Sequence, residues 1–190
     1  MNQKAESEPV HYSDKNIPDY LESLRGVKTD PYYLLLLAGP YKKAKEPFLK
    51  DLEKSVGELA HVDLRGIVSP NEEQTYKNID AFFDSTGTEK NIYFFNGDVL
   101  CGEYTAYTYS STRYATPQSR YLLKAIQSFG KMVILDFKDV DSVDKTLHRM
   151  AHKMIRFEHP ISFFDKLLWR LNKVTVHGHE FSNKRFGVGR

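Results

Sequence analysis

The sequence predicts an α/β protein in which a parallel β-sheet carries helices on both faces. First, the continuous apolar run Tyr32–Ala38 ends at Gly39-Pro40, a pattern typical of a strand buried on both sides of a parallel sheet. Second, strand-like and helix-like segments alternate along the chain, as they do where helices connect parallel strands. Third, 190 residues with 41% hydrophobic and 27% charged side chains fit one globular domain.

The elements follow from short apolar runs and from apolar residues at helical spacing. Including the first run, five strands are expected, the later four at His61–Leu64, Asn91–Phe95, Lys131–Leu135 and Lys153–Phe157. Helices are expected at Glu46–Val56, Asn71–Phe83, Ser119–Phe129, Val143–Met150 and Ile161–Leu171. Between the third strand and the third helix, Gly102–Thr112 is rich in aromatic residues, serine and threonine and is expected to be a loop.

The same pattern divides the chain into four regions. Residues 1–29 are polar and predict a flexible N-terminal arm with a short helix around Pro18–Leu24. Residues 30–160 hold the α/β core, residues 161–176 one further amphipathic helix, and residues 177–190 a basic, flexible tail.

Composition limits the cellular setting and the class of partner. The single cysteine, Cys101, excludes an internal disulfide and suits a reducing cytoplasm. The N-terminus has no apolar stretch typical of a signal peptide, and the longest apolar run is far shorter than the roughly 20 residues of a membrane helix. A net charge of +2 gives no general argument for nucleic-acid binding. We therefore expect a cytoplasmic protein that does not bind membranes, and nucleic-acid binding by the basic tail is kept only as a third, weaker alternative.

Several segments occur in an order that resembles one family. Gly39 and Lys45 fall in the register of the phosphate-binding loop G-x-x-x-x-G-K-[ST], directly after the first strand. Further resemblances, in chain order, are Ser69–Phe83 to the pore-loop serine and second helix, Asn91–Gly97 to the Walker B strand, Val133–Leu135 to the sensor-1 strand, and Val143–Pro160 to the arginine-finger helix and fifth strand. From Tyr32 to Leu171, this order resembles the bacterial AAA ATPases of the AAA+ class that accompany contractile injection machines.

The resemblance implies a fold and a set of site residues. The fold would be a P-loop NTPase-like three-layer α/β/α domain with a five-stranded parallel sheet, the AAA+ large subdomain, with the small helical lid absent or truncated. The implied site residues are Gly39, Lys43 and Lys45 of a degenerate P-loop, Asn96 and Asp98 as a Walker B remnant, and Arg149 as an arginine-finger remnant.

The phosphate-binding positions have lost the chemistry that the family requires. A phosphate loop needs small residues so that backbone N–H groups can approach the phosphates. Here Lys42 and Ala44 occupy those positions, and Glu46 replaces the hydroxyl that would bind Mg²⁺. A carboxylate about 4 Å from a phosphate charge costs about 4 kcal/mol at an effective dielectric constant near 20.

The catalytic positions are also replaced. Asn96 and Gly97 stand where the family has the acid that binds Mg²⁺ and the glutamate that activates water. Phe137 or Lys138 falls near the sensor asparagine, and Met150 replaces the second finger arginine beside Arg149. We therefore expect no ATP hydrolysis and no bound cofactor.

Two functions remain open from the sequence. The first is a non-catalytic, AAA-like pseudo-ATPase acting as a scaffold or regulatory subunit through protein contacts, the partner being an intact AAA ATPase or a second copy. The tyrosines at positions 104, 107, 109 and 114 favour it, because tyrosine clusters suit interfaces. The alternative is a nucleotide-binding AAA-family ATPase with an atypical P-loop, in which Lys45 binds the phosphates of ATP and Asp98 or Asp136 holds Mg²⁺.

No protein metal site is expected. His177 and His179 are separated by one residue in the basic tail, but no cluster of cysteines or carboxylates joins them at ligand spacing.

Overall fold

The computed structural model describes residues 9–26, 32–86, 90–105 and 111–158; in 101–105 and 111–115 it describes the backbone. The predicted helix at Ile161–Leu171 and the basic tail with His177 and His179 lie outside these ranges. In the described residues, no helix has the length and apolar character needed to cross a membrane.

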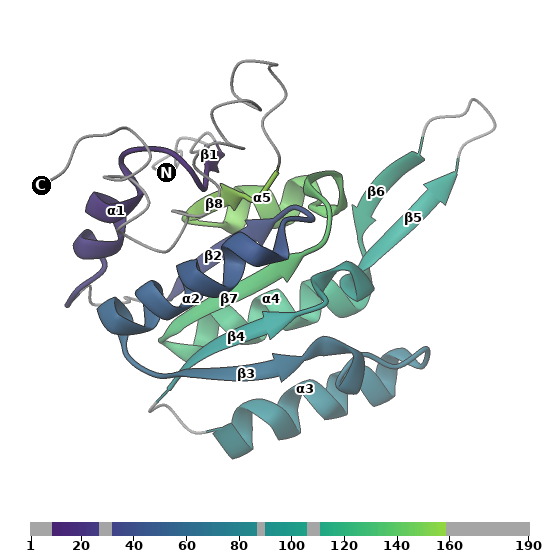
Figure 1. Cartoon of the computed structure of the whole chain (residues 1–190). Helices are drawn as coiled ribbons and strands as arrows, with labels where there is room; N and C mark the ends of the chain where they lie inside the picture. Colours follow the sequence, from purple (N-terminus) through teal and green to yellow (C-terminus); the bar gives the residue numbers. More distant parts are fainter. Residues whose placement is uncertain (1–8, 27–31, 87–89, 106–110, 159–190) are drawn as a thin grey trace, which may run out of the picture.

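The central sheet has six strands, all parallel, in the order β1-β8-β2-β7-β4-β3 (Figure 1). Their bounds are β1 Val10–His11, β2 Tyr33–Ala38, β3 Leu59–Asp63, β4 Asn91–Phe95, β7 Met132–Phe137 and β8 Lys153–Arg156. The parallel α/β fold is thus confirmed, whereas the expected number of five strands is wrong. The additional strand, β1, has only two residues and therefore leaves no apolar pattern in the sequence.

Helices cover both faces of the sheet (Figure 1). One face packs against α1 (Ile17–Ser23) and α2 (Lys42–Val56), the other against α3 (Glu72–Thr86), α4 (Pro117–Phe129) and α5 (Lys145–Met150). The short 3-10 helices η1 (Leu64–Gly66), η2 (Gly97–Leu100) and η3 (Val140–Ser142) follow β3, β4 and β7. Since β1 pairs with β8 and α1 packs on the core, part of the segment predicted as an N-terminal arm belongs to the sheet domain.

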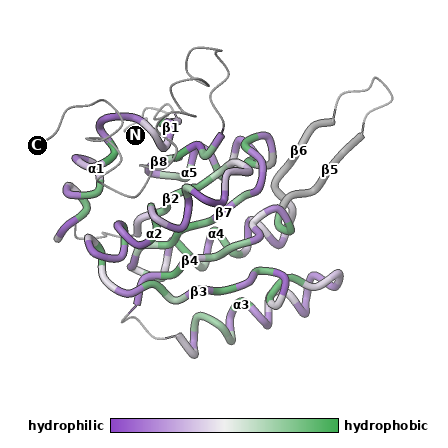
Figure 2. Tube along the Cα trace, in the orientation of Figure 1, coloured by the Kyte–Doolittle hydropathy of each residue, from purple (hydrophilic) through white to green (hydrophobic). Residues whose placement is uncertain are grey.

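The apolar run of β2 explains why this strand lies inside the sheet. Leu35 and Leu37 face the α1/α2 side, Leu34 and Leu36 face the α3/α4 side, and all four side chains are fully buried. Figure 2 shows the same apolar character along β2, β7 and β4. Alternate residues of a strand point to opposite faces, so a strand covered on both sides must be apolar throughout.

Capping residues fix where α4 begins and ends. The Thr116 side chain accepts a hydrogen bond from the Ser119 N–H, and Pro117 occupies the first turn, where its missing N–H costs nothing. Gly130 ends the helix with a left-handed φ of 72°, a conformation that glycine adopts without strain.

The segment predicted as a loop after β4 contains a β-hairpin. Strands β5 (Cys101–Thr105) and β6 (Ser111–Ala115) pair antiparallel and form a second sheet that projects from the body of the protein (Figure 1). The loop prediction is therefore wrong for Gly102–Thr105 and for Ser111 and Thr112. Tyrosine and threonine favour strands as well as interfaces, and this propensity was the available signal.

Candidate functional site

A pocket of about 210 Å³ opens at the C-terminal ends of β2, β4 and β7. Ligands of open parallel α/β sheets bind beyond the carboxyl ends of the strands, so this is where a functional site is expected. The pocket is lined by Gly39, Pro40, Lys42, Lys45, Glu46, Leu49, Tyr93, Phe95, Asn96, Asp136, Phe137 and Lys138.

Lys45 is the buried cation of the pocket, with 5% of its surface exposed. Its ammonium pairs with the Asp136 carboxylate from β7 and donates a hydrogen bond of 2.9 Å to the Phe137 carbonyl oxygen. The Phe157 ring lies on a further side, with its centroid 5.8 Å from Nζ. Buried charges in proteins are normally paired, and here the protein itself supplies the counter-ion.

Tyr93 extends this network from β4. Its hydroxyl donates to the second carboxylate oxygen of Asp136 at 2.7 Å, so each oxygen of that carboxylate has a protein donor. Burial raises the pKa of Asp136, while the Lys45 ammonium and the Tyr93 hydroxyl act in the opposite direction. Burial and the nearby carboxylate also raise the pKa of Tyr93 far above its ordinary value. The phenol therefore stays protonated and continues to donate.

The backbone between β2 and α2 is also engaged internally. Only Gly39, Pro40 and Tyr41 separate the two elements, because α2 already begins at Lys42. The N–H groups of Gly39, Tyr41, Lys42 and Ala44 donate to the carbonyl oxygens of Phe137, Phe157, Pro40 and Tyr41, respectively. A phosphate loop needs such N–H groups free and pointing at the ligand. The segment 39–46 therefore does not form the loop that its spacing suggested.

Gly39 is required here by close packing. Its φ is +127°, and a Cβ at this position would lie 2.4 Å from the Phe157 carbonyl oxygen. The glycine thus allows the end of β2 to approach the backbone beyond β8, and its function in this structure is packing rather than phosphate binding.

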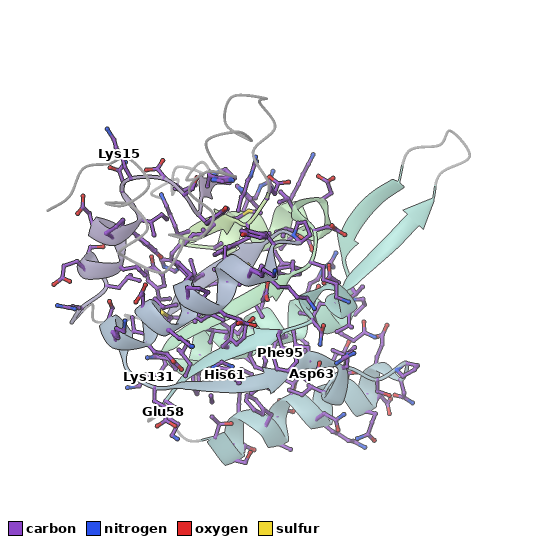
Figure 3. The ribbon with its side chains drawn as sticks, in the orientation of Figure 1. Lys15, Glu58, His61, Asp63, Phe95 and Lys131 are labelled. Carbon is purple, nitrogen blue, oxygen red and sulfur yellow. The ribbon has the colours of Figure 1, made fainter. Side chains whose placement is uncertain are left out.

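The segment after β4 is held by polar contacts to its neighbours. Asn96 has a left-handed φ of 61°, and its amide donates to the Asp63 carboxylate at 2.8 Å. The register pairs Asp63 with Phe95, and Figure 3 shows these two residues near the ends of β3 and β4. The hydrogen bonds from the Arg65 side chain, followed by that from Asn96, lower the pKa of Asp63. Asp98 accepts a hydrogen bond from the Lys138 N–H at 3.0 Å.

The structure brings together only part of the predicted site. Gly39, Lys45 and Asn96 line the pocket. Lys43 is exposed on α2 outside it, Asp98 holds the backbone of Lys138, and Arg149 is exposed on α5 and does not line the pocket.

Two residues of this network, Asp136 and Tyr93, were not predicted in the positions that they occupy. Asp136 was considered only as a metal ligand, whereas it is the counter-ion of Lys45. Tyr93 was not considered, because within an apolar strand its ring is indistinguishable from a core residue. Among the described side chains, no three histidine, cysteine or carboxylate groups are placed to hold a metal ion.

Comparisons with known proteins do not assign the chain to a family. No protein-family model and no curated protein matches it. A chain of the E. coli MS115-1 HORMA:CdnC:Trip13 complex is similar in structure, with 13% sequence identity and a TM-score of 0.48. The match covers 68% of this chain and 49% of that one, so this chain spans about half the length of the solved chain.

These results require a correction to the predicted identity. The resemblance to a degenerate AAA ATPase domain is not upheld, because no family model matches the chain. The structure gives a physical reason, since residues 39–46 form a tight turn and a helix instead of a phosphate loop. The P-loop fold is not confirmed, and the predictions of an AAA+ domain and of ATP binding are not supported.

Proposed function

We propose that this protein is a non-catalytic interaction module, a scaffold or regulatory subunit that acts through protein contacts. The observation that carries the proposal is the pairing of Lys45 with Asp136 in the pocket at the ends of the strands. The buried cation is neutralised by the protein itself, and the N–H groups of the adjacent turn already have carbonyl acceptors. A ligand entering this pocket would have to displace Asp136 and leave its carboxylate with fewer partners, at a cost of several kcal/mol.

The projecting hairpin supports the interaction half of the proposal. Strands β5 and β6 pair only with each other within the described part of the chain. An isolated two-stranded hairpin is marginally stable in water, so a protein partner would stabilise it.

The partner and the location remain proposals as well. The intact AAA ATPase expected from the sequence depended on the corrected resemblance and is not carried forward. A second copy of the chain is the partner that we propose. The cytoplasm is the proposed location, on the basis of the single cysteine.

Two measurements test the two halves of this proposal. The melting temperature of the full chain should stay unchanged in millimolar ATP or ADP with Mg²⁺. A ligand present at a hundred times its dissociation constant would add about 2.7 kcal/mol and raise the melting temperature by several degrees. A rise retained in Lys43→Ala but absent in Lys45→Ala would contradict the non-catalytic reading and favour the nucleotide-binding alternative.

The second measurement is sedimentation velocity over a range of protein concentrations. We expect the weight-average sedimentation coefficient to increase with concentration, because the proposed module associates with itself. A chain that remains monomeric up to millimolar concentration would exclude the second copy as its partner.

A further inference from the structure

The turn that follows β1 places a serine hydroxyl against a histidine ring. The distance between Ser13 Oγ and His11 Nδ1 is 2.6 Å. The other ring nitrogen of His11, Nε2, lies 3.0 Å from the carbonyl oxygen of Glu158, two residues beyond the end of β8. Figure 1 shows β1 beside β8, at one edge of the sheet. The pocket lining includes none of these three residues, so they form a separate cluster.

The carbonyl oxygen of Glu158 determines which nitrogen of the neutral His11 ring carries the proton. A carbonyl oxygen can only accept a hydrogen bond, so Nε2 is protonated and Nδ1 carries the lone pair. The Ser13 hydroxyl therefore donates to Nδ1. A hydroxyl that donates to a base, itself oriented by a third group, has the arrangement of an activated nucleophile.

The sheet and the core hold this cluster in place. His11 pairs with Arg156 in the parallel register of β1 and β8, and the Tyr12 N–H donates to the Arg156 carbonyl oxygen at 2.8 Å. The Tyr12 ring is buried and stacks on Phe157, with 5.4 Å between the ring centroids. Ser13, the next residue, stays partly exposed to solvent. A reagent in solution can therefore reach a hydroxyl whose base is held rigidly.

The size of the activation selects the class of reagent. A positioned general base accelerates a reaction by roughly 10²–10⁴-fold, whereas complete enzyme sites reach about 10⁶-fold or more. An acceleration of this size is enough for acyl donors with a good leaving group, such as aryl esters, thioesters and acyl phosphates. It is too small for amides, whose leaving groups are poor.

We propose that Ser13 is a site of covalent acylation by such activated acyl donors, with His11 as its general base. The Oγ atom attacks the acyl carbonyl carbon and forms an ester bond, while its proton passes to His11 Nδ1. The bond between the acyl carbon and the leaving group then breaks, and the leaving group takes that proton. The net reaction moves the acyl group from the donor to Ser13 and requires no oxidant and no further reactant.

The backbone of the same serine explains why the ester persists. The Ser13 N–H also points at His11 Nδ1, at 3.3 Å. An acylated Oγ has no proton to donate, so this N–H remains as the donor to Nδ1. The occupied imidazole then does not activate water against the ester. The inference thus goes beyond the proposed function without making the protein a catalyst, because each chain is modified once at the β1 edge.

Competitive labelling within one chain tests the reactivity without any substitution. The full chain is treated with p-nitrophenyl acetate, digested and read out by mass spectrometry; alkaline hydroxylamine cleaves serine esters and leaves lysine amides intact. Ser85 is the internal control, because it is exposed and its hydroxyl donates to the Phe82 carbonyl oxygen at 2.9 Å. We expect Ser13 to be acetylated at least about a hundredfold faster than Ser85. Equal rates at the two serines would overturn the proposal.

Two variants test the role of the imidazole. Ser13→Ala should abolish the hydroxylamine-sensitive label on this segment. His11→Gln should slow labelling of Ser13 by about a hundredfold, because an amide can hydrogen-bond to the hydroxyl but cannot take its proton. Melting curves show whether each variant is folded, and the comparison with Ser85 in the unmodified chain decides the matter if one is not. An unchanged rate in folded His11→Gln would exclude His11 as the base.

Release of p-nitrophenolate tests whether the ester persists. We expect a burst that corresponds to one acyl group per chain and is absent in Ser13→Ala, followed by equal slow release in both proteins. Continued turnover that requires Ser13 would contradict both the lasting ester and the non-catalytic character of the proposed function. The absence of any label on Ser13 would refute this inference alone and leave the interaction module in place.

Discussion

The pocket at the ends of the strands and the projecting hairpin satisfy their polar groups in opposite ways. In the pocket, the ammonium of Lys45, both carboxylate oxygens of Asp136 and the N–H groups of the β2–α2 turn all have partners within the protein. In the hairpin, the outer backbone edge of β5 has no strand beside it among the described residues. The comparison teaches that these polar groups at the C-terminal ends of the strands are already paired within the protein, and in this sense we call the region closed, whereas the edge of β5 keeps unused bonding capacity.

The largest effect should follow from breaking the ion pair in the closed region. Asp136→Ala leaves the Lys45 ammonium buried without its counter-ion, and such a loss typically costs about 3–5 kcal/mol of unfolding free energy. Urea denaturation measures it, with the exposed Asp139→Ala as the control, expected within about 0.5 kcal/mol of the unmodified chain. The double variant Lys45→Met/Asp136→Asn should recover more than half of the loss. A loss below about 1 kcal/mol in Asp136→Ala would mean that the pair does not close the pocket.

A slightly smaller effect is expected where the backbone of the closed region packs most tightly. Gly39→Ala combines a φ of +127° with a Cβ only 2.4 Å from the Phe157 carbonyl oxygen, so the backbone must shift. We expect a loss of about 3 kcal/mol, at the upper end of overpacking costs. Gly66→Ala is the control, because nothing lies within 4 Å of its added Cβ. If both variants have equal denaturation midpoints, the close packing of the β2 end is refuted.

Shortening the hairpin should have little effect on the stability of the body. Glu103 and Arg113 are opposite each other in the register, so replacing residues 104–112 with Asn-Gly allows a two-residue turn to close the hairpin. Since the main contacts of β5 and β6 with the body are to η2, α4 and α5, we expect the unfolding free energy to change by less than about 1 kcal/mol. A larger loss in chemical denaturation would show that the hairpin is part of the core.

The smallest effect concerns the exposed ion pair at the end of β3. The pKa of Asp63 lies below its ordinary value of 3.8, mainly because the Arg65 side chain hydrogen-bonds to it. The carboxylate therefore contributes stability above the pKa of the unfolded chain, and this contribution is lost as the pH falls through the lowered folded value. The denaturation midpoint of Arg65→Ala should lie slightly below that of the unmodified chain at pH 7 and should approach it near pH 2. The exposed Arg120→Ala should show no such convergence.

The sequence predicted the sheet better than it predicted the site. The strands β2, β4 and β7 could be recognised because burial on both faces requires continuous apolar runs, which are visible without any tertiary information. β1 could not be recognised, because its two residues join the sheet only through hydrogen bonds to a strand more than a hundred residues away. The hairpin was missed because tyrosine-rich and threonine-rich segments favour both loops at interfaces and strands.

The site shows where spacing alone is insufficient. The six-residue separation of Gly39 and Lys45 indicated a phosphate loop, but the spacing does not show where the helix begins. Because α2 starts at Lys42, residues 42–44 are already helical, and the N–H groups of Tyr41, Lys42 and Ala44 donate to carbonyl oxygens of the protein. The pairing of Lys45 with Asp136, 91 residues later, depends on the neighbouring positions of β2 and β7 in the sheet. That neighbourhood is a property of topology and does not appear in a local motif.

The most direct test of the closed pocket is the chemical accessibility of Lys45. Brief amine labelling of the native chain, read out by mass spectrometry, compares it with Lys42 and Lys43, which are exposed on the same helix. We expect Lys42 and Lys43 to be modified at least ten times faster than Lys45, and we expect millimolar ATP with Mg²⁺ to leave all three rates unchanged. Labelling of Lys45 at the rate of its neighbours, with protection by nucleotide, would show that the lysine is free to bind a ligand and would contradict the account.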